Sequence, residues 1–150
     1  MSNTWLAAES FERGQRLIQA TNTLAISVKL TLAGKYAPER AALAEHAREE
    51  LRTFLGDFAS WLAEAERSPA RVVTGIDPRL HQLVMVFVSQ RRRLPSRSLL
   101  YRLPMEQIRA LLDAHTPGEM QQLLECLQEL RAVFEDHLHA DVVGLLGEGI

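Results

Sequence analysis

The sequence predicts an all-α protein, a single-domain helical bundle over residues 1–150. Apolar residues recur at spacings of three, four and seven through most of the chain, which is the spacing of amphipathic helices. Residues that start and stop helices flank these apolar segments. The length of 150 residues, with 47% hydrophobic and 24% charged residues, is typical of one folded domain. No internal repeat or low-complexity tract interrupts the pattern.

The first two helices are expected to form a long antiparallel hairpin. Residues 4–33 carry an amphipathic pattern, and Gly34 can end that helix. Pro38 suits the first position of a second helix, which extends to about residue 66. The apolar stripe of the second helix consists of Ala44, Ala47, Leu51, Leu55, Phe58, Leu62 and Ala65. Because only four residues connect the two amphipathic helices, they are predicted to pack side by side in opposite directions.

The middle of the chain predicts a buried helix followed by two short basic ones. After an irregular crossover at 67–77, Asp77-Pro78 supplies the cap and first residue of a helix to about residue 90. Its six consecutive apolar residues, at 83–88, predict the buried central helix of the bundle. The β-branched residues among them leave a strand as the alternative. Ser96 can cap a short helix to about residue 102, and Pro104 can open another to about residue 115.

A long acidic helix is expected to end the chain. Thr116-Pro117-Gly118-Glu119 combines a capping residue, an initial proline and a capping-box glutamate, which predicts a helix from here to about residue 146. Its core stripe is predicted to contain Leu127, Leu130, Phe134, Leu138 and Leu145. Cys126 falls within the apolar pattern, where a free thiol acts as a small hydrophobic side chain. A single cysteine suits a reducing compartment.

The sequence predicts a cytoplasmic protein that has no membrane partner. The N-terminus lacks a basic patch followed by an apolar segment, which is the pattern of a secretory signal. The longest apolar runs fall far short of the ~20 residues needed to span a bilayer.

Charge is sorted along the chain, although the net charge of the whole is only −2. Residues 67–109 contain nine arginines and two acids, a net charge of +7, whereas residues 110–150 contain eight acids and a single base, Arg131, a net charge of −7. Such a polarity can be satisfied within the fold, by a neighbouring copy or by an anionic partner.

The basic middle segment holds the candidate binding site. Its residues are Arg91, Arg92, Arg93, Arg97, Leu99, Tyr101 and Arg102. Guanidinium groups bind carboxylates and phosphates, and Tyr101 could stack on a base. Leu99, Tyr101 and Leu103, if exposed, would give a protein partner an apolar anchor. The arginines could instead pair with the acidic C-terminal helix of the same chain or of a neighbour.

The sequence contains no motif of an enzyme, a cofactor or a metal site. A G-x-S-x-G or S-x-x-K nucleophile motif and a glycine-rich phosphate loop are all absent. At about 100° per residue, Glu135 and His139 lie on one flank of an α-helix, while His137 and Asp141 lie roughly 160° away. These two pairs cannot converge on one ion. We therefore expect no catalytic activity, no cofactor and no metal.

Three functional hypotheses follow from these observations. The leading one is a non-enzymatic interaction or assembly subunit, whose charged faces bind a protein partner or a second copy of the chain. The alternative is a small helical subunit of a larger nucleoprotein complex, which contacts the nucleic-acid backbone through its arginines. The third, a metal-bearing bundle, requires His137 or His139 to lie opposite one of the residues Glu45, His46 and Glu49.

Overall fold

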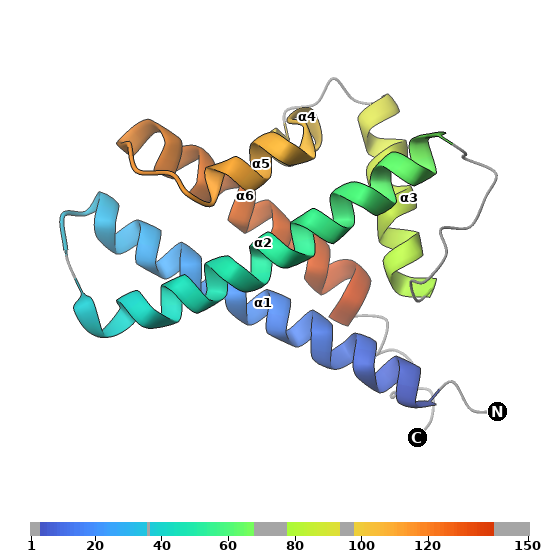
Figure 1. The fold of residues 1–150 in the computed structure, drawn as a ribbon, viewed down its shortest axis with the longest axis horizontal. Helices are drawn as coiled ribbons and strands as arrows, with labels where there is room; N and C mark the ends of the chain where they lie inside the picture. Colours follow the sequence, from blue (N-terminus) through green and yellow to red (C-terminus); the bar gives the residue numbers. More distant parts are fainter. Residues whose placement is uncertain (1–3, 36, 68–77, 94–97, 140–150) are drawn as a thin grey trace.

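The computed structural model describes residues 4–35, 37–67, 78–93 and 98–139, and the side chains of 12–35, 37–67, 79–91 and 98–138. Within this part of the chain all regular structure is helical, so the predicted all-α fold is confirmed. The elements are α1 (Thr4–Leu32), α2 (Pro38–Arg67), α3 (Pro78–Arg93), α4 (Leu99–Arg102), α5 (Met105–Leu111), α6 (Pro117–Phe134) and a π-helical turn, η1 (Glu135–His139) (Figure 1). Residues 83–88 are therefore helical and do not form a strand.

The α1–α2 hairpin forms where the sequence predicts it. Gly34 has a φ of 73°, a left-handed conformation that glycine adopts without strain. The amide of Gly34 donates to the carbonyl of Thr31 at 3.0 Å, and the amide of Lys35 donates to that of Leu30 at 2.8 Å. These two bonds form a Schellman motif, which satisfies the last carbonyls of α1 and turns the chain toward α2.

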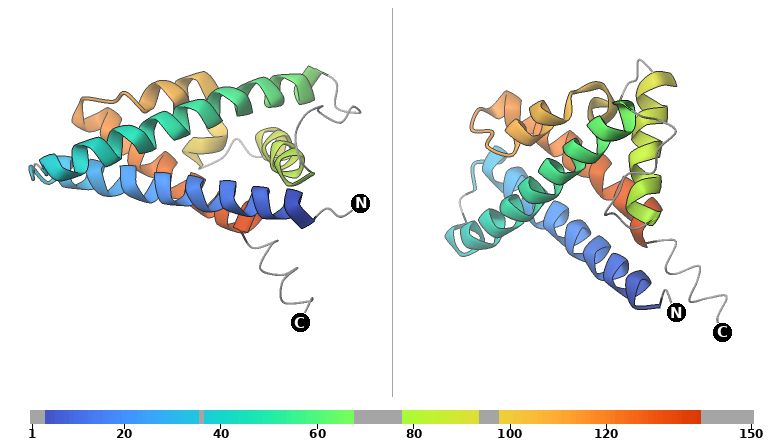
Figure 2. Two further views of the ribbon diagram at one scale, coloured as in Figure 1. Left: turned by 60° about the horizontal axis from the view of Figure 1, so that its bottom comes forward. Right: turned by 45° about the vertical axis from the view of Figure 1, so that its right-hand side comes forward.

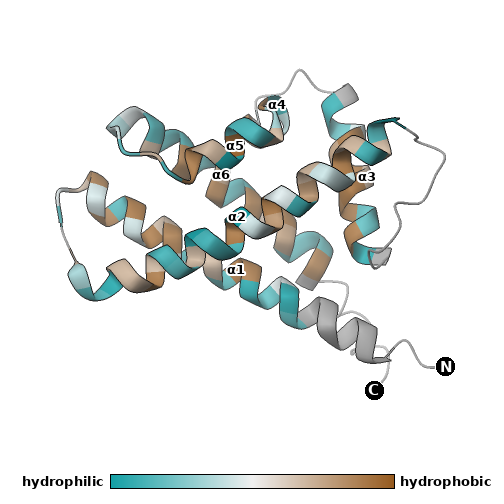
Figure 3. Cartoon of the chain, in the orientation of Figure 1, coloured by the Kyte–Doolittle hydropathy of each residue, from teal (hydrophilic) through white to brown (hydrophobic). Residues whose placement is uncertain are grey.

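The core lies between α1, α2, α3 and α6. Every residue of the stripe predicted for α2 is buried, as are Leu127, Leu130, Phe134 and Leu138 of the final helical segment. Aromatic rings join the helices edge to face: Phe58 meets Phe87 with ring centroids 4.8 Å apart, and Phe54 meets Phe134 at 5.4 Å. Figure 3 shows hydrophobic residues (brown) concentrated where α2, α3 and α6 approach one another.

The position of α3 differs from the prediction that it is the central helix. The hairpin of α1 and α2 diverges away from its tip, and α3 lies at this open end, where it contacts α2, α4 and η1 (Figures 1 and 2). Met85 and Val86 remain partly exposed. It is α6, and not α3, that packs extensively along α1 beside α2. A run of apolar residues indicates that a helix is buried on several sides, but it does not determine which helix lies in the middle.

The final helix changes character after Phe134. The chain continues as the π-helical turn η1, whereas the sequence predicts an α-helix to about residue 146; residues 140–150 lie outside the described part. Leu138 of η1 packs directly against Gly14 of α1: a Cβ added at Gly14 would lie 2.9 Å from the Leu138 Cβ. Glu135 and His137 thus lie in a π-helical turn, for which the α-helical angle between the two His–acid pairs does not hold, and Asp141 lies outside the described residues.

A membrane-spanning helix is not found among the described elements, because none of them combines sufficient length with sufficient hydropathy.

Burial makes Cys126 chemically inert in the folded chain. The residue is 0% exposed, and burial, together with the charges of Glu129 and Glu125, raises the pKa of its thiol to about 12. Because the thiolate is the reactive form, we expect a disulfide reagent such as Ellman's reagent to modify Cys126 only as fast as the chain unfolds. The measurement compares labelling in native buffer and in urea, with glutathione as the control. Prompt stoichiometric labelling of the native protein would contradict this expectation.

Candidate functional site

The basic segment is described in part. The structure places the side chains of Arg91, Leu99, Tyr101 and Arg102. Arg97 and the side chains of Arg92 and Arg93 lie outside the described residues. The visible part of the predicted site is centred on α4, a single helical turn between α3 and α5.

The N-terminal end of α4 is capped by an acid of α6. The side chain of Ser98 makes no capping bond to α4, although Ser98 occupies the cap position. Glu129 Oε2 instead accepts hydrogen bonds from Ser98 Oγ and from the amide of Leu100, both at 2.8 Å. A carboxylate at this end of a helix satisfies amides that have no partner within the helix. The acidic helix and the basic segment are thus joined by a capping contact.

The C-terminal end of α4 is held by an arginine of α3. Arg91 Nη2 donates a hydrogen bond to the carbonyl of Leu103 at 2.8 Å, while Arg91 Nε is buried and has no hydrogen-bond partner in the described structure. Burial lowers the pKa of Arg91 below its usual value, and the charge of Glu66 opposes that shift. Arg91 therefore fixes the α3–α4 corner and is not a free group for a ligand.

The predicted apolar anchor is directed into the core. Leu99 is only 5% exposed, and Leu103 is partly buried against core residues. Tyr101 packs edge to face on Phe87, with ring centroids 4.8 Å apart. Burial, and then the charges of Glu129 and Asp136, raises the pKa of its phenol. The expectation that these residues form an exposed anchor is corrected for Leu99, because a one-turn helix keeps its place only by burying its apolar side chains.

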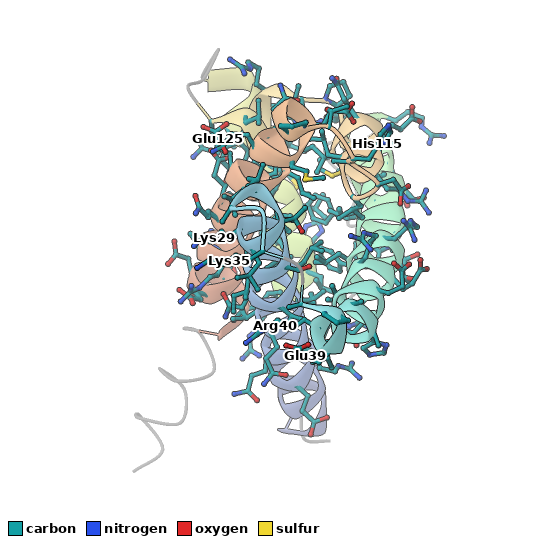
Figure 4. The ribbon with its side chains drawn as sticks, turned by 90° about the vertical axis from the view of Figure 1, so that its left-hand side faces the viewer. Lys29, Lys35, Glu39, Arg40, His115 and Glu125 are labelled. Carbon is teal, nitrogen blue, oxygen red and sulfur yellow. The ribbon has the colours of Figure 1, made fainter. Side chains whose placement is uncertain are left out.

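Charged side chains of both signs surround this corner at the surface. Arg102 ends α4 and Arg109 lies in the last turn of α5; both are exposed. Glu125 of α6 and Asp136 of η1 are also exposed, and Figure 4 shows Glu125 on the outer side of α6. Within the described part of the chain, none of these four residues forms an ion pair. Glu106, in the first turn of α5, is likewise exposed and forms no ion pair among the described side chains, so α5 presents one acid and one arginine to a partner.

Internal ion pairs involve other residues. Those found among the described side chains are His46–Glu50, Arg48–Glu45, Arg52–Glu49, Arg52–Asp113 and Arg131–Glu135. None of these joins Arg91, Arg102 or Arg109 to an acid of α6. The hypothesis that these three arginines pair with the final helix of their own chain is therefore not met for the side chains that the structure describes.

Two arginines that the sequence analysis did not single out hold the end of α5. Arg48 Nε, from α2, donates to the carbonyl of Leu112 at 2.7 Å, and Arg52 pairs with Asp113. Both arginines lie on the polar face of α2, where the sequence alone predicts only solvent. The contact could not be anticipated because it joins segments that are distant in sequence.

A cavity of about 360 Å³ lies between α1 and α2. Its lining residues are Arg13, Arg16, Leu17, His46, Glu49, Glu50, Thr53, Phe54, Asp57 and Trp61. This cavity cannot be predicted from the sequence, because each helix contributes only one wall and no local motif indicates it.

The third hypothesis, a metal site, finds no support in the described side chains. No three histidine, cysteine, aspartate or glutamate residues among them gather closely enough to hold an ion. His46, one of the three alternative ligands on α2 in that hypothesis, instead pairs with Glu50 at 3.0 Å. The side chain of His139 lies outside the described part.

Three comparisons with known proteins were negative. No family model, curated protein or solved structure matches the chain.

Proposed function

We propose that this chain is a non-enzymatic helical interaction subunit, which assembles through a surface at α4–α5 that carries Arg102 and Arg109 beside a single acid, Glu106, and through an acidic surface at α6–η1. The observation that carries the proposal is the state of four exposed charges. Arg102, Arg109, Glu125 and Asp136 make no ion pair within the described part of the chain. Exposed charges of opposite sign favour a partner that presents the complementary arrangement. A second copy of this chain presents it, because each copy carries both surfaces.

The surroundings of Tyr101 favour a protein partner over a nucleic acid. Stacking on a base requires an exposed aromatic face, whereas this ring packs on Phe87. Glu129 and Asp136 lie near enough to raise the pKa of Tyr101. Carboxylates close to Tyr101 repel phosphate groups but attract arginines of a second copy. A protein surface of mixed charge therefore complements this region better than a phosphate backbone.

Reversing the charge at Arg102 tests the proposal. We expect the wild-type chain to self-associate at about 50 mM salt and to dissociate at about 500 mM, because salt screens exposed charges. Arg102→Glu should raise the dissociation constant about tenfold, while leaving the fold unchanged because Arg102 is exposed. Sedimentation velocity measures both effects. Arg40→Glu, at the tip of the α1–α2 hairpin (Figure 4), is the matched control and should associate like the wild type.

Two results would count against the proposal. A wild-type chain that stays monomeric at about 50 mM salt would contradict self-association through these surfaces. Salt-sensitive binding of labelled single-stranded RNA that is lost in Arg102→Glu, without any change in oligomeric state, would support the nucleic-acid alternative instead.

A further inference from the structure

The cavity between α1 and α2 has walls of opposite charge. Arg13 and Arg16 stand on the α1 side, whereas the carboxylates Glu49, Glu50 and Asp57 stand on the α2 side. With a volume of about 360 Å³, the cavity falls at the lower end of the range of about 300–1,000 Å³ that is usual for ligand sites. This space is large enough for a small molecule.

Not all of these charges are available to a ligand. Glu49 is paired with Arg52, and Glu50 is paired with His46 at 3.0 Å. Within the described part of the chain, Arg13, Arg16 and Asp57 form no ion pair, and all three are exposed. The α1 wall therefore offers free positive charge and the α2 wall a free negative charge, and the cavity separates them.

The cavity also has an apolar, partly aromatic surface. Leu17 and Phe54 are buried beneath it, and Trp61 is half-buried at its edge. The rings of Phe54 and Trp61 meet at a centroid distance of 6.3 Å with their planes 77° apart, which holds the indole in place. A fixed aromatic surface between two polar walls favours a flat apolar group.

We propose that this cavity binds a small zwitterion, with a flat apolar body, a carboxylate at one end and an ammonium group at the other. The carboxylate lies toward Arg13 and Arg16, the ammonium group lies toward Asp57, and the body lies against Phe54 and Trp61. A ligand of one charge leaves the opposite wall unmatched, so both ends contribute to affinity. This binding site goes beyond the proposed assembly function and does not depend on it.

Three matched probes test the proposal. The zwitterion is para-(aminomethyl)benzoate; para-toluate keeps only its carboxylate, and para-methylbenzylamine keeps only its ammonium group. The Trp5→Phe variant leaves Trp61 as the single tryptophan, so its fluorescence reports on the cavity directly. We expect saturable changes in fluorescence, with the zwitterion binding about tenfold more tightly than either single-charge probe.

Two substitutions then assign each end of the ligand. Arg13→Gln should lower the affinity for the zwitterion and for para-toluate about tenfold and leave the affinity for para-methylbenzylamine unchanged. Asp57→Asn should lower the affinity for the zwitterion and for para-methylbenzylamine by a similar factor and leave the affinity for para-toluate unchanged. Arg40→Gln, outside the cavity, should alter none of the three affinities. Circular dichroism confirms that each variant remains folded.

The crossed pattern is what separates this site from weak surface binding. Equal affinities for the three probes would overturn the proposal. An equal loss of affinity for all three probes in Arg13→Gln would overturn it too. The absence of saturable binding of the zwitterion at millimolar concentration would overturn it as well.

Discussion

Replacing Gly14 with alanine should destabilise the protein by about 1–2 kcal/mol, although removing a glycine from a helix usually stabilises it. The gain in helix propensity is worth up to about 1 kcal/mol. Against it stands the contact between α1 and η1, where the new Cβ would lie 2.9 Å from the Leu138 Cβ. Leu138 Cβ is attached to the backbone and cannot swing away, so the two helices must separate. Such overpacking costs about 1–3 kcal/mol.

Gly56→Ala is the matched control for this prediction. A Cβ there would lie 3.2 Å from the guanidinium of Arg109, the mobile end of an exposed side chain. That group can move aside at little cost, so the propensity term prevails and stability should rise by up to about 1 kcal/mol. In urea unfolding the two midpoints should therefore move in opposite directions. Equal stabilisation by both substitutions would show that α1 and η1 tolerate a wider separation.

The sequence predicts those features of this fold that depend on local chemistry. The α2 stripe is buried as its spacing indicates, because helical periodicity places those side chains on one face. Thr116 accepts a hydrogen bond from the amide of Glu119 at 3.2 Å, so the predicted start of α6 is confirmed. Gly34 likewise ends α1 where the sequence predicts it. Each of these signals lies within a few residues of the structure that it specifies.

Features that depend on distant contacts were not predictable in the same way. The capping of α4 joins Ser98 and Leu100 to Glu129, which lies in another helix, about thirty residues further along the chain. Arg91 was predicted as a ligand-binding residue, but it holds the carbonyl of Leu103. Charge and residue type indicate what a side chain can bind. They do not indicate which part of the chain will reach it first.

Glu129→Ala should lower the free energy of unfolding by about 2–3 kcal/mol. The substitution removes one carboxylate oxygen that accepts two hydrogen bonds, and it leaves the amide of Leu100 and the hydroxyl of Ser98 without this partner. Hydrogen bonds to a charged group contribute about 1.5–3 kcal/mol, and a part-buried donor without a partner adds a desolvation cost. Because α4 is a single turn, it has little stability of its own with which to offset the loss.

Two variants separate the capping contact from a general effect of charge. Glu125→Ala removes an exposed acid one turn earlier in α6 and should change stability by no more than about 0.5 kcal/mol. Glu129→Gln keeps an acceptor oxygen and loses only the charge, so it should cost about 1 kcal/mol. Hydrogen exchange provides the local measurement: the Leu100 amide should lose protection in Glu129→Ala and keep it in Glu125→Ala. Equal effects of the two alanine substitutions would mean that Glu129 acts through net charge alone.

The packing of α6 along α1 has a consequence for how the chain folds. These helices lie near opposite ends of the sequence, yet they share one of the most extensive contacts of the core. Closing so long a loop is entropically costly and slow, and the ribosome makes the two partners far apart in time. Until α6 is made, the part of the apolar face of α1 that packs on α6 stays uncovered. The α4 turn also lacks Glu129, which caps it. The fold is thus completed late in synthesis, and a nascent chain that stalls before α6 presents an open hydrophobic surface to chaperones.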